Sequence, residues 1–435
     1  MHDPRRTTRH RRILIAASLA ALLPTAGWAS GFYLQEQSAR GTGRAYSGEA
    51  ADQGPASLWW NPASIAGLDH SELDSSLTGV QLWSKSRDQG STIQRAGRVG
   101  AEGSDNIESN VISNGIVPAG AGALRLGARW AVGLSVTAPF NFATQYGSAS
   151  WTRYAALTSR VQTIDIQPTL AWRPTSWLGL GGGPNIEHVL AALSSALPNL
   201  SASQPDGITT LHGTGWNAGY NLGLQLHLLD DRLIFGAAYR SRIVHEVDGT
   251  FDVAGLQGYL AGQNGHSHAQ AGFTTPWAAT FGIRYRATKN LTLDAQLVRT
   301  GWSEFDAVRI TQPVSSISPQ NYHDVTSGAI GLDYVVTPAW SLRTGVQFDP
   351  TPSPDTNRDP NIPDGDRWMF GLGTSVAITR QLTIDASALY LDIAPSRINR
   401  DASAYGGTPL STPVQLHGTV GSNSLVLALA TRLVF

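Results

Sequence analysis

Two kinds of side chain alternate along residues 216–228. The even-numbered positions from Trp216 to Leu228 are all apolar, whereas the odd-numbered positions carry asparagine, glycine, glutamine and histidine. Successive side chains of a β-strand point to opposite faces, so this segment predicts a strand with one apolar face and one small or polar face. A strand of a soluble sandwich would also have an apolar face, but its other face would be rich in lysine and glutamate. The pattern therefore favours a β-barrel with an outer face toward lipid and an inner face toward a lumen.

Comparable alternation recurs from about Asp69 to the end of the chain. Counting such segments predicts about fourteen strands, an even number of the kind that bacterial single-chain barrels use. We expect them near residues 72–85, 114–127, 129–142, 159–173, 176–190, 214–229, 232–247, 270–287, 290–308, 322–337, 339–349, 366–380, 381–393 and 421–435. The predicted fold class is all-β, a 14-stranded antiparallel transmembrane β-barrel over residues 71–435.

The links between these segments differ in length. Asp230-Asp231 and Thr288-Lys289 are short and are typical of periplasmic turns. Long polar stretches are interpreted as extracellular loops, at 87–113, 191–213, 248–270, 349–365 and 395–421. A soluble sandwich would not be expected to show this short–long rhythm, so the link lengths also favour a membrane barrel.

The first 29 residues have the organisation of an export signal. Arginines between Arg5 and Arg12 precede the apolar segment Ile13–Leu23, and Gly27-Trp28-Ala29 fits a cleavage site. The apolar segment is shorter than the ~20 residues that a membrane-spanning helix needs. We therefore expect cleavage after Ala29 and insertion of the mature chain into the outer membrane of a Gram-negative bacterium.

Composition and motifs exclude several other functions. The net charge of −1 gives no basic face for nucleic acid, and the absence of cysteine excludes thiolate metal sites and cysteine nucleophiles. His266 and His268 have no evident third ligand, so no metal is predicted. The chain has neither a G-x-S-x-G elbow nor a phosphate-binding loop, so we expect no cofactor, no catalytic residue and no enzyme activity.

Residues 30–70 differ from everything that follows them. Small residues alternate there with isolated apolar ones, and the segment contains Trp59-Trp60-Asn61-Pro62-Ala63 near its end. A glycine-rich and weakly apolar segment makes a poor independent domain, but it can fill a lumen. We therefore interpret it as a plug inside the barrel.

The start of this segment also resembles a known family. Residues 31–36 (GFYLQE), residues 41–49 (GTGRAYSGE) and Asn61-Pro62-Ala63 resemble the hatch of the FadL/TodX family, and residues 343–349 and 362–367 add further matches. The resemblance implies a mostly helical N-terminal hatch inside a 14-stranded barrel. It also implies passive transport of a long-chain fatty acid or aromatic hydrocarbon, captured outside and released sideways into the membrane. A general diffusion porin and, less favoured, an outer-membrane lipase are the alternatives.

The lateral exit in that family lies where the third strand is kinked. Here the third strand contains Pro139, which cannot donate to a sheet ladder, so Pro139, Phe140 and Asn141 are candidates for a lateral opening. The alternative is that Pro139 simply ends the strand. Asn61, Pro62 and Ala63 match the hatch motif and are candidates for a gate or a structural lock, with an ordinary turn as the alternative.

Two residues are candidates for ligand binding through the same resemblance. Phe32 matches the position that reaches the internal pocket, although it could be a passive packing residue. Arg309 matches a basic position near the ligand carboxylate, with pairing to Asp306 as the alternative. The family's second basic position falls near Ser194, where this sequence is uncharged, so a neutral hydrocarbon gains weight over a carboxylate.

The remaining expectations concern partners. An alternating strand ends at the C-terminal Phe435, which we expect to contact the barrel-assembly machinery. We expect a monomer that is surrounded by outer-membrane lipid or detergent. The ligand is expected to be a long-chain fatty acid or another hydrophobic hydrocarbon.

Overall fold

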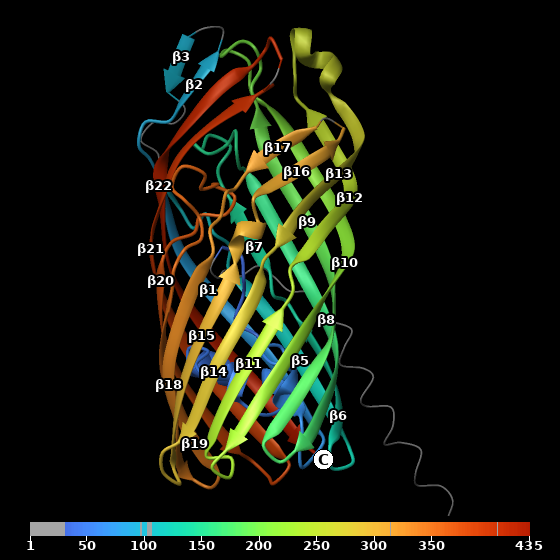
Figure 1. Cartoon of the computed structure of the whole chain (residues 1–435). Coiled ribbons are helices and arrows are strands. Elements are labelled where there is room, and N and C mark those ends of the chain that lie inside the picture. The colour runs from blue at the N-terminus through green and yellow to red at the C-terminus, as the bar shows by residue number, and fades with distance from the viewer. Residues whose placement is uncertain (1–30, 96–97, 102–106, 314, 407) are drawn as a thin grey trace, which may run out of the picture.

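The computed structural model describes residues 31–95, 98–101, 107–313, 315–406 and 408–435. The predicted export signal at 1–29 lies outside these residues. Fourteen antiparallel strands form a closed barrel, as the alternation predicts (Figure 1). They are β1 (Glu72–Asp88), β5 (Gly115–Leu126), β6 (Trp130–Thr137), β8 (Thr158–Thr175), β9 (Leu178–Leu197), β10 (Gly207–Leu228), β11 (Leu233–Arg240), β14 (Trp277–Arg286), β15 (Leu291–Gly301), β18 (Val325–Thr337), β19 (Trp340–Asp349), β20 (Arg367–Ala377), β21 (Leu382–Ala404) and β22 (Thr412–Val434). The barrel closes because β1 pairs with β22 along its whole length, from Glu72↔Val434 to Asp88↔Gly418.

Shorter elements extend this wall at the end opposite the C-terminus. The strands β2, β3, β16 and β17 lie at that end in Figure 1. The elements are β2 (Thr92–Arg95), β3 (Arg98–Ala101), β4 (Ile107–Ser109), β7 (Asn141–Gln145), β12 (Ile243–Ala254), η4 (Gly258–Gln263), β13 (Gly265–Thr275), η5 (Trp302–Glu304), β16 (Ala307–Gln312) and β17 (Ser316–Pro319). The third predicted strand is thus divided into β6 and β7.

Several stretches expected to be loops are instead largely strand. The predicted loop at 191–213 contains the end of β9 and the start of β10, which pair from Gly207↔Leu197 onward. The predicted loop at 395–421 likewise contains parts of β21 and β22, paired as far as Ala404↔Thr412. These extensions carry polar residues on both faces, so the apolar alternation that identifies lipid-facing strands is missing there.

The outer face of the barrel carries the apolar parity, as expected. Trp216 is 62% exposed and Leu222 is 56% exposed, whereas Asn221 and Gln225 of the other parity are buried inside. Exposed aromatic and aliphatic side chains on the outside are stable in lipid and would be unfavourable in water. Within the described part of the chain, no helix combines the length and the hydropathy needed to cross a membrane.

The N-terminal segment lies inside the barrel, where its short helical turns are drawn in blue in Figure 1. They are α1 (Ala39–Gly43), η1 (Glu49–Ala51), η2 (Pro55–Ser57) and η3 (Pro62–Ile65). Ser38 caps α1 by accepting a hydrogen bond from the Gly41 nitrogen at 3.3 Å, as serine commonly does at a helix start. We call residues 31–67 the hatch.

Glycines in the wall let the hatch backbone come close. A Cβ atom at Gly345 of β19 would lie 1.9 Å from the carbonyl oxygen of Arg44, and one at Gly236 of β11 would lie 1.9 Å from that of Ala50. No side chain fits at such a distance, so only glycine is compatible with the seated hatch. The inward glycines of the strands therefore form part of the hatch seat.

Buried ion pairs also connect the hatch to the wall. Arg44 of the hatch pairs with Asp52 at 2.7 Å and with Asp333 of β18 at 3.0 Å. Arg284 of β14 and Arg343 of β19 also reach Asp333, at 2.7 and 3.1 Å. Buried charges are stable only when they are paired, so removing one partner would leave others uncompensated.

Candidate functional site

The third strand of the wall is broken at the predicted position. β6 ends at Thr137 and β7 begins at Asn141, with Pro139 between them. Across the break, the Leu34 nitrogen donates to the Pro139 carbonyl oxygen at 2.7 Å, and the Asn141 nitrogen donates to the Phe32 carbonyl oxygen at 3.0 Å. The start of the hatch therefore takes the place of a neighbouring strand at this point.

The break has a different register on each side. Toward β8, four residue steps from Thr137 to Asn141 face only three steps from Asp165 to Gln162, which is a one-residue bulge. Toward β5, the ladder stops at Gly120↔Val136. Pairing resumes only at the isolated bridge between Ile112 and Thr144. The wall between these two contacts is interrupted.

Asn61, Pro62 and Ala63 lie in the hatch, against a different part of the wall from the break. Asn61 caps η3 by accepting from the Ala63 nitrogen at 2.9 Å. Its amide nitrogen donates to the carbonyl oxygens of Ala50, at 2.6 Å, and of Leu224 in β10, at 3.0 Å. Asn61 is fully buried, so the tripeptide ties the hatch to β10, whereas residues 32–37 contact the third-strand break.

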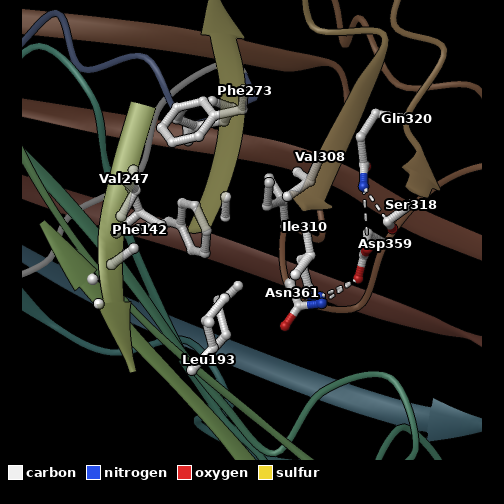
Figure 2. A pocket seen from close by; sticks show the side chains of 18 of the residues that line it. Phe142, Leu193, Val247, Phe273, Val308, Ile310, Ser318, Gln320, Asp359 and Asn361 are labelled. Carbon is white, nitrogen blue, oxygen red and sulfur yellow. Dashed lines mark hydrogen bonds between the residues drawn. The ribbon is translucent and has the colours of Figure 1, made fainter. Parts of the chain in front are cut away.

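An apolar cavity of about 170 Å³ lies inside the barrel and borders the start of the hatch (Figure 2). Phe32 lines it and is fully buried. The centroid of its ring lies 5.1 Å from that of Phe305 and 5.7 Å from that of Phe142. Phe32 also lies 5.6 Å from Phe140 of the break. The structure thus brings Phe32 together with Phe140, so one side chain contacts both the cavity and the interrupted wall. Most of the remaining lining is apolar, including Phe142, Leu193, Val247, Phe273, Val308 and Ile310.

One end of the cavity is polar. Figure 2 shows Ser318, Gln320, Asp359 and Asn361 gathered there. Asp359 accepts from the Asn361 side chain at 2.6 Å and from Gln320 at 3.3 Å, and it pairs with Arg400 of β21 at 3.1 Å. Sequence reasoning missed these residues because Asp359 and Asn361 belong to a stretch, 349–365, that has the composition of an external loop.

Arg309 does not line this cavity. On β16 it lies between Val308 and Ile310, and both of these neighbours line the cavity. The Arg309 guanidinium donates to the Asp306 carboxylate at 2.9 Å, and this hydrogen bond lowers the pKa of that carboxyl below its usual value. The structure therefore contains the pairing with Asp306 that was the alternative for this residue.

The two histidines of the predicted loop at 248–270 contact carboxylates of the neighbouring strand. The described residues contain no group of three or more histidine, aspartate or glutamate side chains arranged to hold a metal ion. His266 instead contacts Asp252 at 2.7 Å, and His268 contacts Asp248 at 3.7 Å. Both contacts join β13 to β12.

A plugged, lipid-facing β-barrel with an apolar internal cavity defines a class of membrane channel. Residues 20–435 match the family model described as outer membrane protein transport protein (OMPP1/FadL/TodX). The chain belongs to this family, and it is an outer-membrane β-barrel protein.

Individual relatives agree with this assignment. The long-chain fatty acid transport protein of Escherichia coli O6:H1 is 25% identical over 411 residues, covering 86% of this chain and 90% of that protein. The 47 kDa outer membrane protein of Pasteurella multocida is 26% identical over 419 residues, covering 89% and 92%. Among solved structures, a FadL homologue of Pseudomonas aeruginosa superposes with a TM-score of 0.82 at 21% identity, covering 93% of this chain and 99% of that one. The toluene transporter TodX of Pseudomonas putida gives 0.68 at 16% identity, covering 94% and 100%. The two structural matches show the shared fold.

Proposed function

We propose that the protein transports hydrophobic small molecules passively at the outer membrane, taking them from outside into the plugged lumen and releasing them into the membrane through the interrupted wall at residues 138–140. The observation that carries this proposal is the position of Phe32, which lies against both the apolar cavity and Phe140 of the break. A molecule leaving the cavity at this point would pass from one apolar environment to another. The names of relatives, a long-chain fatty acid transport protein and a toluene transporter, fit such a cargo.

The cavity suits an apolar ligand in size as well as in chemistry. Its volume of about 170 Å³ is similar to that of an engineered apolar cavity of about 150 Å³ that binds benzene. Transfer of an apolar group from water gains about 0.8 kcal/mol per buried methylene. We propose Phe32 as a ligand-contacting residue and assign no carboxylate-binding role in the cavity to Arg309.

The hatch motif has a separate role in this proposal. Asn61, Pro62 and Ala63 act as a lock that holds the hatch on β10, because the hydrogen bonds of Asn61 bridge the two. Pro139, Phe140 and Asn141 border the exit. Phe435, which is exposed at the end of the barrel wall, remains our candidate for contact with the barrel-assembly machinery.

Uptake by cells tests the function directly. Deletion of the gene from its native strain should lower the uptake of radiolabelled toluene or hexadecanoate, and renewed expression should restore it. A general porin would instead show steady, sugar-permeable conductance in planar bilayers, and a lipase would hydrolyse esters when purified. Either result without hydrocarbon or fatty-acid uptake would contradict the proposal.

A further inference from the structure

The polar end of the cavity has a chemistry that neither a hydrocarbon nor a fatty-acid anion matches. We propose that the cavity prefers ligands that combine an apolar body with one uncharged hydroxyl group, such as a phenol or an alkyl alcohol. This inference rests on the proposed function, because it takes the cavity as the transport ligand's site. It names the chemical class that the polar end would select.

The charge at this end argues against a carboxylate. Arg400 is the cation beside the polar end, and it already contacts Asp359 at 3.1 Å, Ser318 at 2.8 Å and the carbonyl oxygen of Asn357 at 2.9 Å. Asp359, not Arg400, lines the cavity, and the described lining residues include no lysine or arginine. An anionic head group entering here would therefore meet a carboxylate of the same sign.

The hydrogen bonds at this end call for a donor. The Gln320 amide nitrogen donates to Asp359 at 3.3 Å. Because a paired carboxylate only accepts, the atom facing it must be the nitrogen. The Gln320 side-chain oxygen is then left buried without a hydrogen-bond partner among the described residues. A buried acceptor without a partner is unfavourable, and an alkane cannot relieve it.

A ligand hydroxyl group can bond to both the Gln320 side-chain oxygen and the Ser318 hydroxyl. Ser318 accepts hydrogen bonds from Arg400 and Gln320, so its own proton remains for a ligand oxygen. A ligand hydroxyl can accept from Ser318 and donate to Gln320, whereas a carboxylate can only accept. In Figure 2, Val247, Phe142 and Leu193 lie away from this polar group, where they would hold the hydrocarbon part of the same ligand.

Three ligands of matched size separate the alternatives, namely p-cresol, toluene and 4-methylbenzoate. Binding of each to the purified full-length protein would be measured by equilibrium dialysis. We expect wild-type protein to bind p-cresol at concentrations where 4-methylbenzoate does not bind. Gln320→Leu should weaken p-cresol binding about 5–30-fold, the usual result of losing one hydrogen bond to a buried group, and should leave toluene binding unchanged or tighter.

Gln270→Leu is the matched control. The Gln270 side chain donates to Asp248 of β12 at 3.0 Å, and neither residue lines the cavity. This variant should change the binding of none of the three. If Gln320→Leu does not fold, Ser318→Ala should show the same selective loss of p-cresol binding. The comparison of the three ligands on wild-type protein does not depend on either variant. Tighter binding of 4-methylbenzoate, or equal effects of Gln320→Leu on p-cresol and toluene, would overturn the hydroxyl preference while leaving transport intact. Absence of binding by both toluene and p-cresol would contradict the proposed function itself.

Discussion

The backbone nitrogen of Leu34 donates a hydrogen bond to the carbonyl oxygen of Pro139 at 2.7 Å, so the hatch supplies the partner that the broken third strand lacks. Tyr33 and Phe140 form an antiparallel bridge next to this bond. Phe32 lines the cavity and directly precedes Tyr33 and Leu34 in the chain. A shift of Phe32 would therefore act on the hydrogen bonds that cover the break. The cavity and the interrupted wall are thus joined by three consecutive residues.

The inward glycines of the hatch seat predict that a single substitution by a larger residue will displace the hatch. Gly345→Val would place a Cβ atom 1.9 Å from the Arg44 carbonyl oxygen, so the hatch must move away from β19. We expect faster amide hydrogen exchange in residues 39–52, since overpacking of this kind typically costs about 1–3 kcal/mol. Gly79→Val is the control, because the nearest atom to its Cβ would be 3.9 Å away. Equal exchange in both variants would contradict the close seating of the hatch.

The lock role of Asn61 is tested by Asn61→Ala. This change removes the cap of η3 and the hydrogen bonds that the Asn61 amide donates to the carbonyl oxygens of Ala50 and Leu224, of which the Ala50 oxygen still accepts from Gln225 at 3.0 Å. Loss of the cap should lower local stability by about 1 kcal/mol, and loss of each hydrogen bond by about 0.5–1.5 kcal/mol. Hydrogen exchange of residues 49–65 should rise while that of the barrel strands stays the same. Asn290→Ala, in an exposed turn, serves as the control, and an unchanged hatch would rule out the lock.

Arg309→Ala separates the two interpretations of that residue. Its guanidinium pairs with Asp306 at the surface and not with the cavity. We expect the binding free energies of hexadecanoate and of toluene each to change by less than about 0.5 kcal/mol, as for most surface substitutions. Isothermal titration of wild type and variant provides the measurement. A selective loss of hexadecanoate binding would restore Arg309 as the anchor of a carboxylate.

The sequence predicts the barrel better than it predicts the site. Each membrane strand must present apolar side chains to lipid, so alternation such as that from Trp216 to Leu228 identifies the strands directly. Pro139 marks the broken strand because proline has no amide proton for the ladder. Alternation could also have placed Arg309 away from the cavity, since Val308 and Ile310 on either side of it are apolar.

The polar end of the cavity could not be predicted in this way. Asp359 and Asn361 lie in a polar stretch, and polar composition is the same whether such a stretch covers the outside of a barrel or folds back into its lumen. The hydrogen bonds of Asn361, such as the one that its side chain donates to the Ala155 carbonyl oxygen between β7 and β8 at 3.3 Å, depend on segments far apart in the chain. Pairing over such separations leaves no local pattern in the sequence.

Deletion of Pro139 tests most directly whether ligands leave sideways through the interrupted wall. Deleting this one residue would match the third strand to β8 step for step and remove the bulge between Thr137 and Asn141. Cells expressing this variant should take up radiolabelled toluene no faster than cells without the protein, although the purified barrel remains folded and still binds toluene. Deletion of Gly262, which lies in η4 with no atom near its Cβ position, should leave uptake unchanged. Wild-type uptake by the folded Pro139-deletion variant would contradict the lateral route.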